Sequence, residues 1–262
     1  MSNDNSPNFS GKKIFFLYPS PIIQHEVGFE LIQQEYEIYG IKDHTYIKRA
    51  LELFPDSILF INLDEQMSPT GWETWITELT DDPALSRVSI GVLSSTSDPD
   101  IKRKYITSNK IQHGFITLHK TEVTRTVQHI YNILQEADAR GRRKYIRANT
   151  EQDANTTINI ALNRKYLNGI IRDISVVGFS CIFHEDPELE KNLLCRDIQL
   201  KLQSMLLKVE GVVFGTRMDG ERKIYVFLFS QRIDPDVRIK IRTYIQSSLQ
   251  AKMDQLLKTE QE

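Results

Sequence analysis

Three arginines near the middle of this sequence have side chains suited to binding a ligand that contains phosphate and guanine. Residues 142–147 read RRKYIR, so Arg143 and Arg147 form an R-x-x-x-R spacing and Arg142 directly precedes it. A guanidinium group donates paired hydrogen bonds to phosphate oxygens or to O6 and N7 of guanine. Because Gly141 is expected to end a helix, these arginines would lie in a linker able to fold over a ligand. On the alternative interpretation they form only a solvated basic linker.

A second motif further along the chain supplies complementary polar groups. Residues 173–178 read DISVVG, a D-x-S-x-x-G pattern. Asp173 can accept hydrogen bonds from guanine N–H groups, and Ser175 can donate to a phosphate or cap a turn. Gly178 suits a position of positive φ or of close backbone approach. The alternative is that these residues only make a turn.

The two motifs, in this order and followed by strand-rich sequence, resemble the two-part nucleotide-binding signature of the PilZ family of bacterial cyclic di-GMP receptors. The resemblance implies cyclic di-GMP as a ligand, with neither a cofactor nor a metal. In this family an arginine at the place of Arg142 is associated with two intercalated ligand molecules, which implies two molecules per chain here. The implied ligand-binding residues are Arg142, Arg143, Arg147, Asp173, Ser175 and Gly178.

The composition is typical of a globular protein with two domains of ordinary size. The chain has 262 residues, of which 40% are hydrophobic and 26% are charged. A net charge of −2 argues against nucleic-acid binding by whole-chain electrostatics. No apolar run approaches the roughly 18 residues of a membrane-spanning helix, and Met1–Ser10 lacks the apolar region of a signal peptide. We therefore expect a cytoplasmic protein without membrane insertion, with Cys181 and Cys195 as free buried thiols.

Residues 12–139 are predicted to form a doubly wound α/β domain with a parallel sheet. Short apolar runs indicate strands buried on both faces, and helical patterns lie between them. The predicted strands are Lys13–Tyr18, Tyr36–Ile41, Ser57–Leu63, Val88–Leu93 and Gly114–Leu118. The predicted helices are Ile22–Glu35, Thr45–Leu53, Thr74–Leu79, Lys102–Ser108 and Val123–Ala139.

This half resembles the receiver domain of two-component response regulators in length, element order and several residues. Asp64 ends the third strand, where receivers keep the phosphate-accepting aspartate. Ser94 and Ser95 follow the fourth strand and Lys120 follows the fifth, near the positions of the receiver hydroxyl and lysine. After the first strand, however, Tyr18-Pro19 replace the acidic pair with which receivers hold Mg²⁺. The sequence therefore predicts a pseudo-receiver that is not phosphorylated. On the alternative interpretation, Asp64 only caps the turn before Met67 and Pro69.

Residues 148–262, which follow the basic linker 140–147, are predicted to form a small antiparallel PilZ β-barrel with a C-terminal helix. Asp219-Gly220 is a strong hairpin signal, and Asp234-Pro235 open the helix. The predicted strands are Thr156–Leu162, Leu167–Ile174, Phe179–Phe183, Ile198–Leu202, Leu206–Thr216 and Lys223–Phe229. The helix has an apolar stripe that would cover the barrel mouth or pack on the other domain, with a coiled-coil dimer as the alternative. The stripe consists of Val237, Ile241, Ile245, Leu249, Met253 and Leu256.

The leading hypothesis is a cyclic di-GMP receptor that binds the second messenger between the arginine linker and the barrel. Binding would change the domain orientation and signal to a protein partner, which the sequence does not name. The family resemblance suggests motility and biofilm formation as the processes served. The alternatives are a phosphorylation-controlled response regulator with a β-barrel output domain and a ligand-independent PilZ-like scaffold. An enzyme is not expected, because the sequence contains none of the common hydrolase, nucleotide-phosphatase or metalloprotease motifs.

Overall fold

The computed structural model describes residues 11–108, 110–119, 121–151, 153, 155–162 and 165–258. The expectations for Met1–Ser10 and for Lys120 therefore fall outside the described residues. The chain divides into two compact units. The first contains the residues up to Lys144 together with the C-terminal residues from Lys252, and the second contains Tyr145–Ala251.

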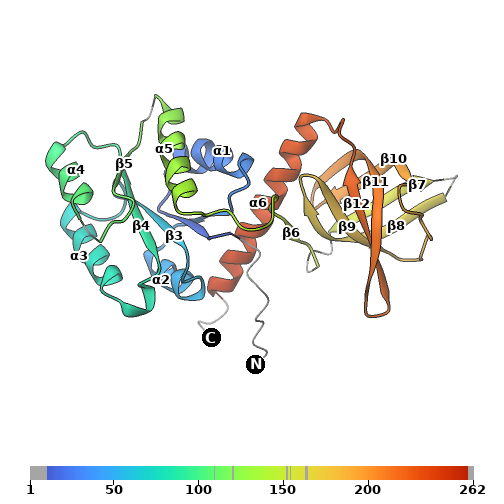
Figure 1. Ribbon diagram of the computed structural model, residues 1–262, viewed down its shortest axis with the longest axis horizontal. Helices are drawn as coiled ribbons and strands as arrows, with labels where there is room; N and C mark the ends of the chain where they lie inside the picture. Colours follow the sequence, from blue (N-terminus) through green and yellow to red (C-terminus); the bar gives the residue numbers. More distant parts are fainter. Residues whose placement is uncertain are drawn as a thin grey trace. The chain divides into compact units, whose positions relative to one another are not determined.

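The first unit is built on a parallel sheet of five strands in the order β2-β1-β3-β4-β5 (Figure 1). The strands are β1 (Ile14–Leu17), β2 (Ile38–Ile41), β3 (Ile58–Asn62), β4 (Ser89–Ser94) and β5 (Phe115–Thr117). The apolar runs form strands here because helices cover both faces of the sheet and exclude water from both. The position of β1 between β2 and β3 is the doubly wound arrangement, which confirms the predicted α/β fold.

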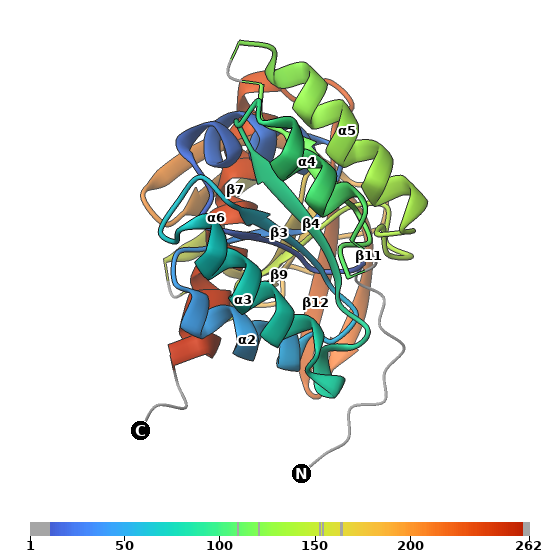
Figure 2. The ribbon, with the colours of Figure 1, turned by 90° about the vertical axis from the view of Figure 1, so that its left-hand side faces the viewer.

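Helices connect successive strands of this sheet. They are the π-helix η1 (Ile23–Val27), α1 (Gly28–Gln33), α2 (His44–Leu53), α3 (Pro69–Thr80), the 3₁₀ turn η2 (Pro83–Leu85), α4 (Pro99–Ile106) and α5 (Val123–Glu136). Figure 1 shows α1 beside α5, and Figure 2 shows α2 beside α3. The third helix begins earlier than predicted, because Ser68 accepts a hydrogen bond from the Gly71 N–H and Pro69 occupies the first turn.

The last helix of the first unit ends earlier than predicted, at Glu136, so Gly141 does not end it. Asp138 has φ +48°, the left-handed conformation that commonly follows a helix. Its N–H donates to the Gln135 carbonyl at 3.1 Å, and the Ala139 N–H donates to the Leu134 carbonyl at 2.9 Å. These two bonds form a Schellman motif, which satisfies the last carbonyls and stops the helix.

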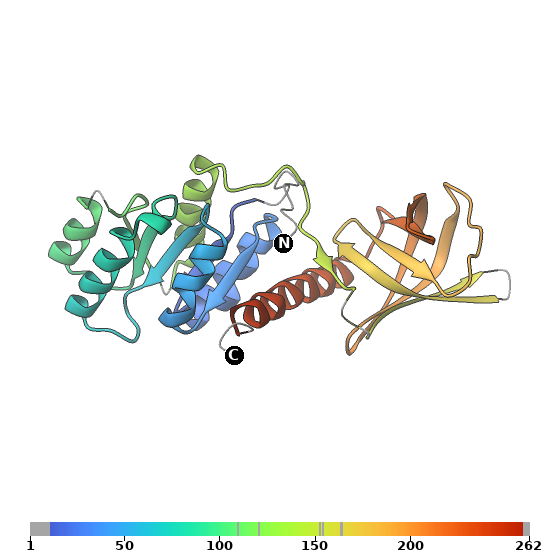
Figure 3. The ribbon, with the colours of Figure 1, turned by 90° about the horizontal axis from the view of Figure 1, so that it is seen from below.

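The second unit is a closed antiparallel barrel of six strands in the order β8-β7-β10-β11-β12-β9, in which β9 pairs again with β8. The strands are β7 (Thr156–Leu162), β8 (Lys165–Ser175), β9 (Gly178–Phe183), β10 (Leu194–Leu202), β11 (Met205–Asp219) and β12 (Arg222–Phe229). Figure 3 shows them curving around one core. The predicted hairpin at Asp219-Gly220 joins β11 to β12, with Gly220 at φ +60°. The barrel confirms the all-β half of the predicted fold.

A short strand that the sequence analysis missed, β6 (Ala148–Asn149), pairs with the end of β8. Two residues are too few for an alternating apolar pattern to be visible in the sequence. Pairing aligns Ala148 with Ile174 and Asn149 with Asp173. The strand therefore fixes the chain directly ahead of it beside the D-x-S-x-x-G motif.

The C-terminal helix α6 (Pro235–Lys258) packs on the barrel through the middle of its apolar stripe. Ile241 and Ile245 are fully buried in the barrel core, and Tyr244 is 2% exposed between them. The predicted stripe is wrong at its end, because Leu256 is 43% exposed and Leu257 is buried instead. The stripe shifts by one residue because an α-helix has 3.6 residues per turn, so strict spacing by four drifts off the buried face.

Candidate ligand-binding site

A β-bulge turns Asp173 toward the outside of the barrel. Ile171 and Ile174 are both buried, although strict alternation along a strand would place residues three apart on opposite faces. The pairing of β8 with β9 shifts register between Ile171 and Asp173, so Arg172 is the extra residue of a bulge. Asp173 then lies opposite Ser180 of β9, while Ile174 returns to the core.

The Asp173 carboxylate binds two side chains that come from different parts of the chain. Arg147 Nη1 donates to Asp173 Oδ1 at 3.3 Å, and the Ser180 hydroxyl donates to Oδ2. Arg147 directly precedes β6, and the pairing of β6 with β8 explains why the guanidinium reaches this carboxylate. The structure thus brings together one residue from each of the two sequence motifs.

Ser175 and Gly178 build the turn that joins β8 to β9. Ser175 is 2% exposed, and its hydroxyl donates to the Gly178 carbonyl at 3.1 Å and accepts from the Val177 N–H at 3.4 Å. Of the two roles considered for Ser175, the observed contacts are those of a turn cap. A Cβ at Gly178 would lie 2.1 Å from the Phe227 carbonyl oxygen, so the glycine serves close backbone approach and not positive φ.

The remaining two arginines lie in the segment ahead of the barrel unit. Arg142 and Arg143 are exposed, and the second unit begins at Tyr145. Tyr145 and Ile146 are half-buried and pack against the barrel core, which holds the chain down just before Arg147. The ligand role predicted for Arg142 and Arg143 stays a prediction.

Two contributors to this site were not found in the sequence. Ser180 lies two residues after the D-x-S-x-x-G motif, and only the hairpin pairing shows that it faces Asp173. Arg172 is the bulge residue, and its guanidinium binds Glu151 and, at 3.1 Å, Asp219. The signal for the bulge was the apolar pattern itself, since isoleucines three apart cannot share a face of a regular strand.

The charges of the site are paired yet accessible. The Arg147 side chain is 50% exposed and that of Asp173 is 21% exposed. An ion pair at this exposure contributes little to folding, so either partner can exchange its bond for one to a ligand. Within the described residues, no cluster of three or more His, Cys, Asp or Glu side chains is placed to hold a metal ion.

The receiver-like edge of the first unit carries a different set of contacts. Asp64 Oδ2 accepts the Ser95 N–H at 2.8 Å, and Oδ1 accepts the Ser94 hydroxyl. Tyr18, at the end of β1, has φ +51°, and its hydroxyl bonds to His44 Nδ1 at 2.8 Å. An aromatic side chain and a proline thus follow β1 where a receiver presents carboxylates.

A family model for the PilZ domain matches residues 141–247. This range includes the R-x-x-x-R and D-x-S-x-x-G motifs and the six strands of the barrel. None of the curated proteins compared with the chain matches it significantly. Within the described residues, no helix combines the length and the apolarity needed to cross a bilayer.

Several solved structures are similar to part of the chain. The PilZ domain with c-di-GMP of YcgR from Escherichia coli is 16% identical with a TM-score of 0.39, over 45% of this chain and 99% of that domain. A longer YcgR structure in complex with c-di-GMP gives the same identity and TM-score, and the match spans 50% of it. The inhibitor of motility MotI from Bacillus subtilis is 17% identical with a TM-score of 0.35, over 43% of this chain and 52% of that one. The match thus spans about half the length of these longer proteins.

Proposed function

Residues 141–247 of this chain are a PilZ domain, and on that premise we propose that the protein is a receptor for cyclic di-GMP. The observation that carries the proposal is the contact between Arg147 and Asp173, one residue from each half of the nucleotide-binding signature. Residues far apart in the sequence meet on an accessible face, as a two-part site requires. The protein acts as a signalling module whose output is a changed surface.

In the proposed complex each signature residue has a distinct role. The guanidinium groups of Arg143 and Arg147 donate to phosphate oxygens or to the O6 and N7 edge of guanine. The Asp173 carboxylate accepts guanine N–H groups, while Ser180 holds it in place. Ser175 and Gly178 act indirectly, because they shape the turn that presents Asp173. Arg142 stacks on an exposed guanine and allows a second ligand molecule to bind.

Signalling follows from the split location of these groups. Arg142 and Arg143 belong to the linker 140–147, and Asp173 belongs to the barrel, so a ligand that binds both restrains the linker. A ligand shifts a conformational equilibrium only through contacts that differ between the states, and the linker arginines provide such contacts. We propose that the receiver-like domain 12–139 is reoriented in this way relative to the barrel domain 148–262, and that a protein partner reads the change.

Calorimetric titration of the full chain with cyclic di-GMP tests the proposal. We expect saturable binding by the native protein and an affinity lower by roughly 30-fold or more for Asp173→Ala. Truncating one partner of a charged contact that is buried in the complex costs about 2–5 kcal/mol. Glu221→Ala, which removes an exposed carboxylate from the β11–β12 turn, is the matched control and should bind normally. Absence of binding by the native protein would exclude the receptor function and leave the ligand-independent scaffold.

A further inference from the structure

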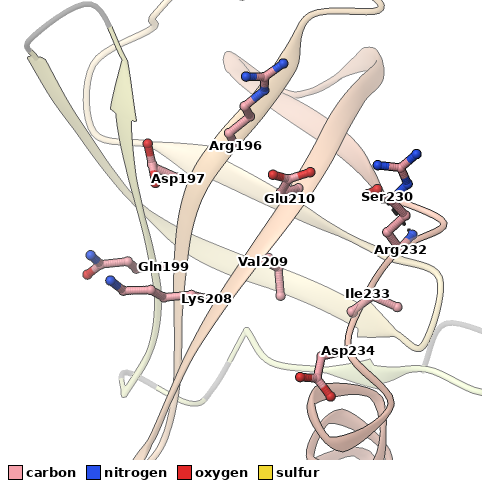
Figure 4. A pocket seen from close by; sticks show the side chains of 10 residues that line it. All are labelled: Arg196, Asp197, Gln199, Lys208, Val209, Glu210, Ser230, Arg232, Ile233 and Asp234. Atoms are coloured by element: carbon pink, nitrogen blue, oxygen red, sulfur yellow. Dashed lines mark hydrogen bonds between the residues drawn. The ribbon is translucent and has the colours of Figure 1, made fainter.

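A second concave site lies on the outside of the barrel, between β10, β11 and the segment 230–234 that leads into α6 (Figure 4). Its volume is about 290 Å³. Figure 4 shows Val209 and Ile233 in the middle, surrounded by charged side chains from three separate segments. The charged residues are Arg196, Asp197, Lys208, Glu210, Arg232 and Asp234. We call this site the β10–β11 groove.

Local irregularities of the backbone create the groove. The pairing of β10 with β11 shifts register between Cys195 and Ile198, so Arg196 and Asp197 form a bulge. Bulges occur preferentially next to functional sites, where they redirect side chains. On the other side, the segment after β12 turns sharply, with the Ile233 N–H donating to the Ser230 carbonyl at 3.2 Å. Ile233 thereby packs against the barrel core and forms part of the groove floor.

Five of the six charged side chains of the groove have no hydrogen-bond or ion-pair partner within the described part of the chain. These five are Arg196, Asp197, Lys208, Glu210 and Arg232. On β12, by contrast, Lys223 is paired with Asp186 at 3.2 Å. Unpaired charges of both signs around an apolar floor have the composition of a polar interface rim around an apolar centre.

The balance of charge selects the kind of partner. Three basic and three acidic side chains give the groove no net charge, so it has no attraction for a second cyclic dinucleotide or for nucleic acid. A compact anion or cation would meet repulsion as well as attraction. An extended polypeptide segment with an apolar side chain between acidic and basic ones can satisfy both signs and cover Ile233, which is only partly buried.

The groove is connected to the signature turn by the end of β12. The Phe229 N–H donates to the Val177 carbonyl at 2.9 Å, inside the D-x-S-x-x-G turn. The next residue, Ser230, lines the groove and donates its N–H to the Glu210 carbonyl at 2.8 Å. A displacement of the turn therefore reaches the groove through two consecutive backbone hydrogen bonds.

We propose that the β10–β11 groove is a docking site for an extended segment of a partner protein that carries acidic and basic side chains on either side of an apolar one. Binding of cyclic di-GMP at the signature turn changes the affinity of the groove through Phe229 and Ser230. The link to cyclic di-GMP rests on the proposed function, whereas the docking site does not.

The test uses the full chain and a blocked pentapeptide of Glu, Lys, Leu, Glu and Lys, in that order, followed by amide chemical shifts. We expect saturable shifts at groove residues such as Arg232 and Ile233, and none with a peptide in which serine replaces the four charged residues. Arg232→Glu and Glu210→Lys should each weaken binding about tenfold, because each places a like charge against the peptide. The matched controls Arg222→Glu and Glu221→Lys make the same charge changes on the β11–β12 turn and should bind normally.

Equal binding by the groove variants and the native protein, or no saturable binding, would overturn the docking site. Repetition with saturating cyclic di-GMP tests the link, and we expect the peptide affinity to change at least about threefold. An unchanged affinity when cyclic di-GMP is bound would overturn the link. Peptide binding by a protein that does not bind cyclic di-GMP would refute the receptor function and leave the docking site standing.

Discussion

Arg147 contributes to ligand binding more than to folding in the proposed site. Its ion pair with Asp173 is half-exposed, and exposed pairs contribute about 0–1 kcal/mol to stability. We expect Arg147→Ala to unfold at nearly the same temperature as the native protein. Its affinity for cyclic di-GMP should be roughly 30- to 5,000-fold weaker, the equivalent of about 2–5 kcal/mol. Arg143→Ala should behave in the same way. Titration and thermal unfolding together measure both effects.

Arg222→Ala is the control for these two variants, since it removes an exposed guanidinium outside the signature. Native affinity for cyclic di-GMP in both Arg143→Ala and Arg147→Ala would show that the ligand binds elsewhere.

Gly178, unlike Arg147, contributes more to folding than to ligand binding, because it acts through the backbone. A Cβ there would lie 2.1 Å from the Phe227 carbonyl oxygen, which is a backbone atom held in the β9–β12 ladder. We expect Gly178→Val to lower the free energy of unfolding by about 2–4 kcal/mol, measured by denaturant titration. Gly215→Ala is the matched control, since nothing lies within 4 Å of its added Cβ. A Gly178→Val protein as stable as the native one would contradict the observed strand pairing.

At the scale of elements, a buried polar network anchors α6 to the barrel. The Tyr244 hydroxyl lies 3.0 Å from Thr156 Oγ1 and donates to Asp153 Oδ2 at 3.2 Å. Burial acts to raise the pKa of Asp153, but hydrogen bonds, including those from Thr156 and Tyr244, outweigh it and lower the pKa below its ordinary 3.8. The ionised carboxylate is therefore the form that the folded protein favours.

We expect Tyr244→Phe to destabilise the barrel by about 1–3 kcal/mol, because Thr156 and Asp153 each lose a hydrogen bond to the Tyr244 hydroxyl in the core. The contribution of a group with a lowered pKa is present above its unfolded value and is lost as the pH falls through the folded one. The difference in the free energy of unfolding between the native protein and Tyr244→Phe should thus be full at neutral pH and shrink below pH 3.8. Tyr166→Phe, at a 73% exposed position, should have no effect. If the stability difference between the native protein and Tyr244→Phe stays constant down to low pH, the ionised Asp153 carboxylate does not contribute to this network.

The carboxyl edge of the parallel sheet gives a prediction about phosphorylation. Both Asp64 oxygens accept hydrogen bonds from β4 and the residue after it, and Tyr18 and Pro19 offer no carboxylate for Mg²⁺. Incubation with a small phosphodonor and Mg²⁺ should therefore add no phosphate by intact mass. An adduct that forms on the native chain and disappears in Asp64→Asn would restore the response-regulator hypothesis.

For the whole molecule, the proposed restraint of the linker depends on how many ligands bind. Two intercalated cyclic di-GMP molecules carry four negative charges, and a third planar cation offsets that charge while covering the outer guanine. We expect two ligands per chain for the native protein and one for Arg142→Leu. Lys144→Leu removes a positive charge without a planar group and should keep two. A native stoichiometry of one at saturation would rule out this role for Arg142.

The two fold classes and the signature could be predicted from the sequence, because both depend on local information. Apolar runs with helical spacing between them specify a parallel sheet, and alternating runs with turns such as Asp219-Gly220 specify antiparallel strands. The PilZ resemblance likewise needed only the types and order of a few residues, and the match over residues 141–247 confirms it.

Which side chains meet, in contrast, depends on contacts that form only in the folded chain. The bulge at Arg172 directs Asp173 outward, and the two residues of β6 bring Arg147 to it. In the sequence the bulge shows only as a break in the alternating pattern, and β6 is too short to have a pattern. The position of Ser180 opposite Asp173 could not be predicted either, since strand register is a property of the closed barrel and not of either strand alone.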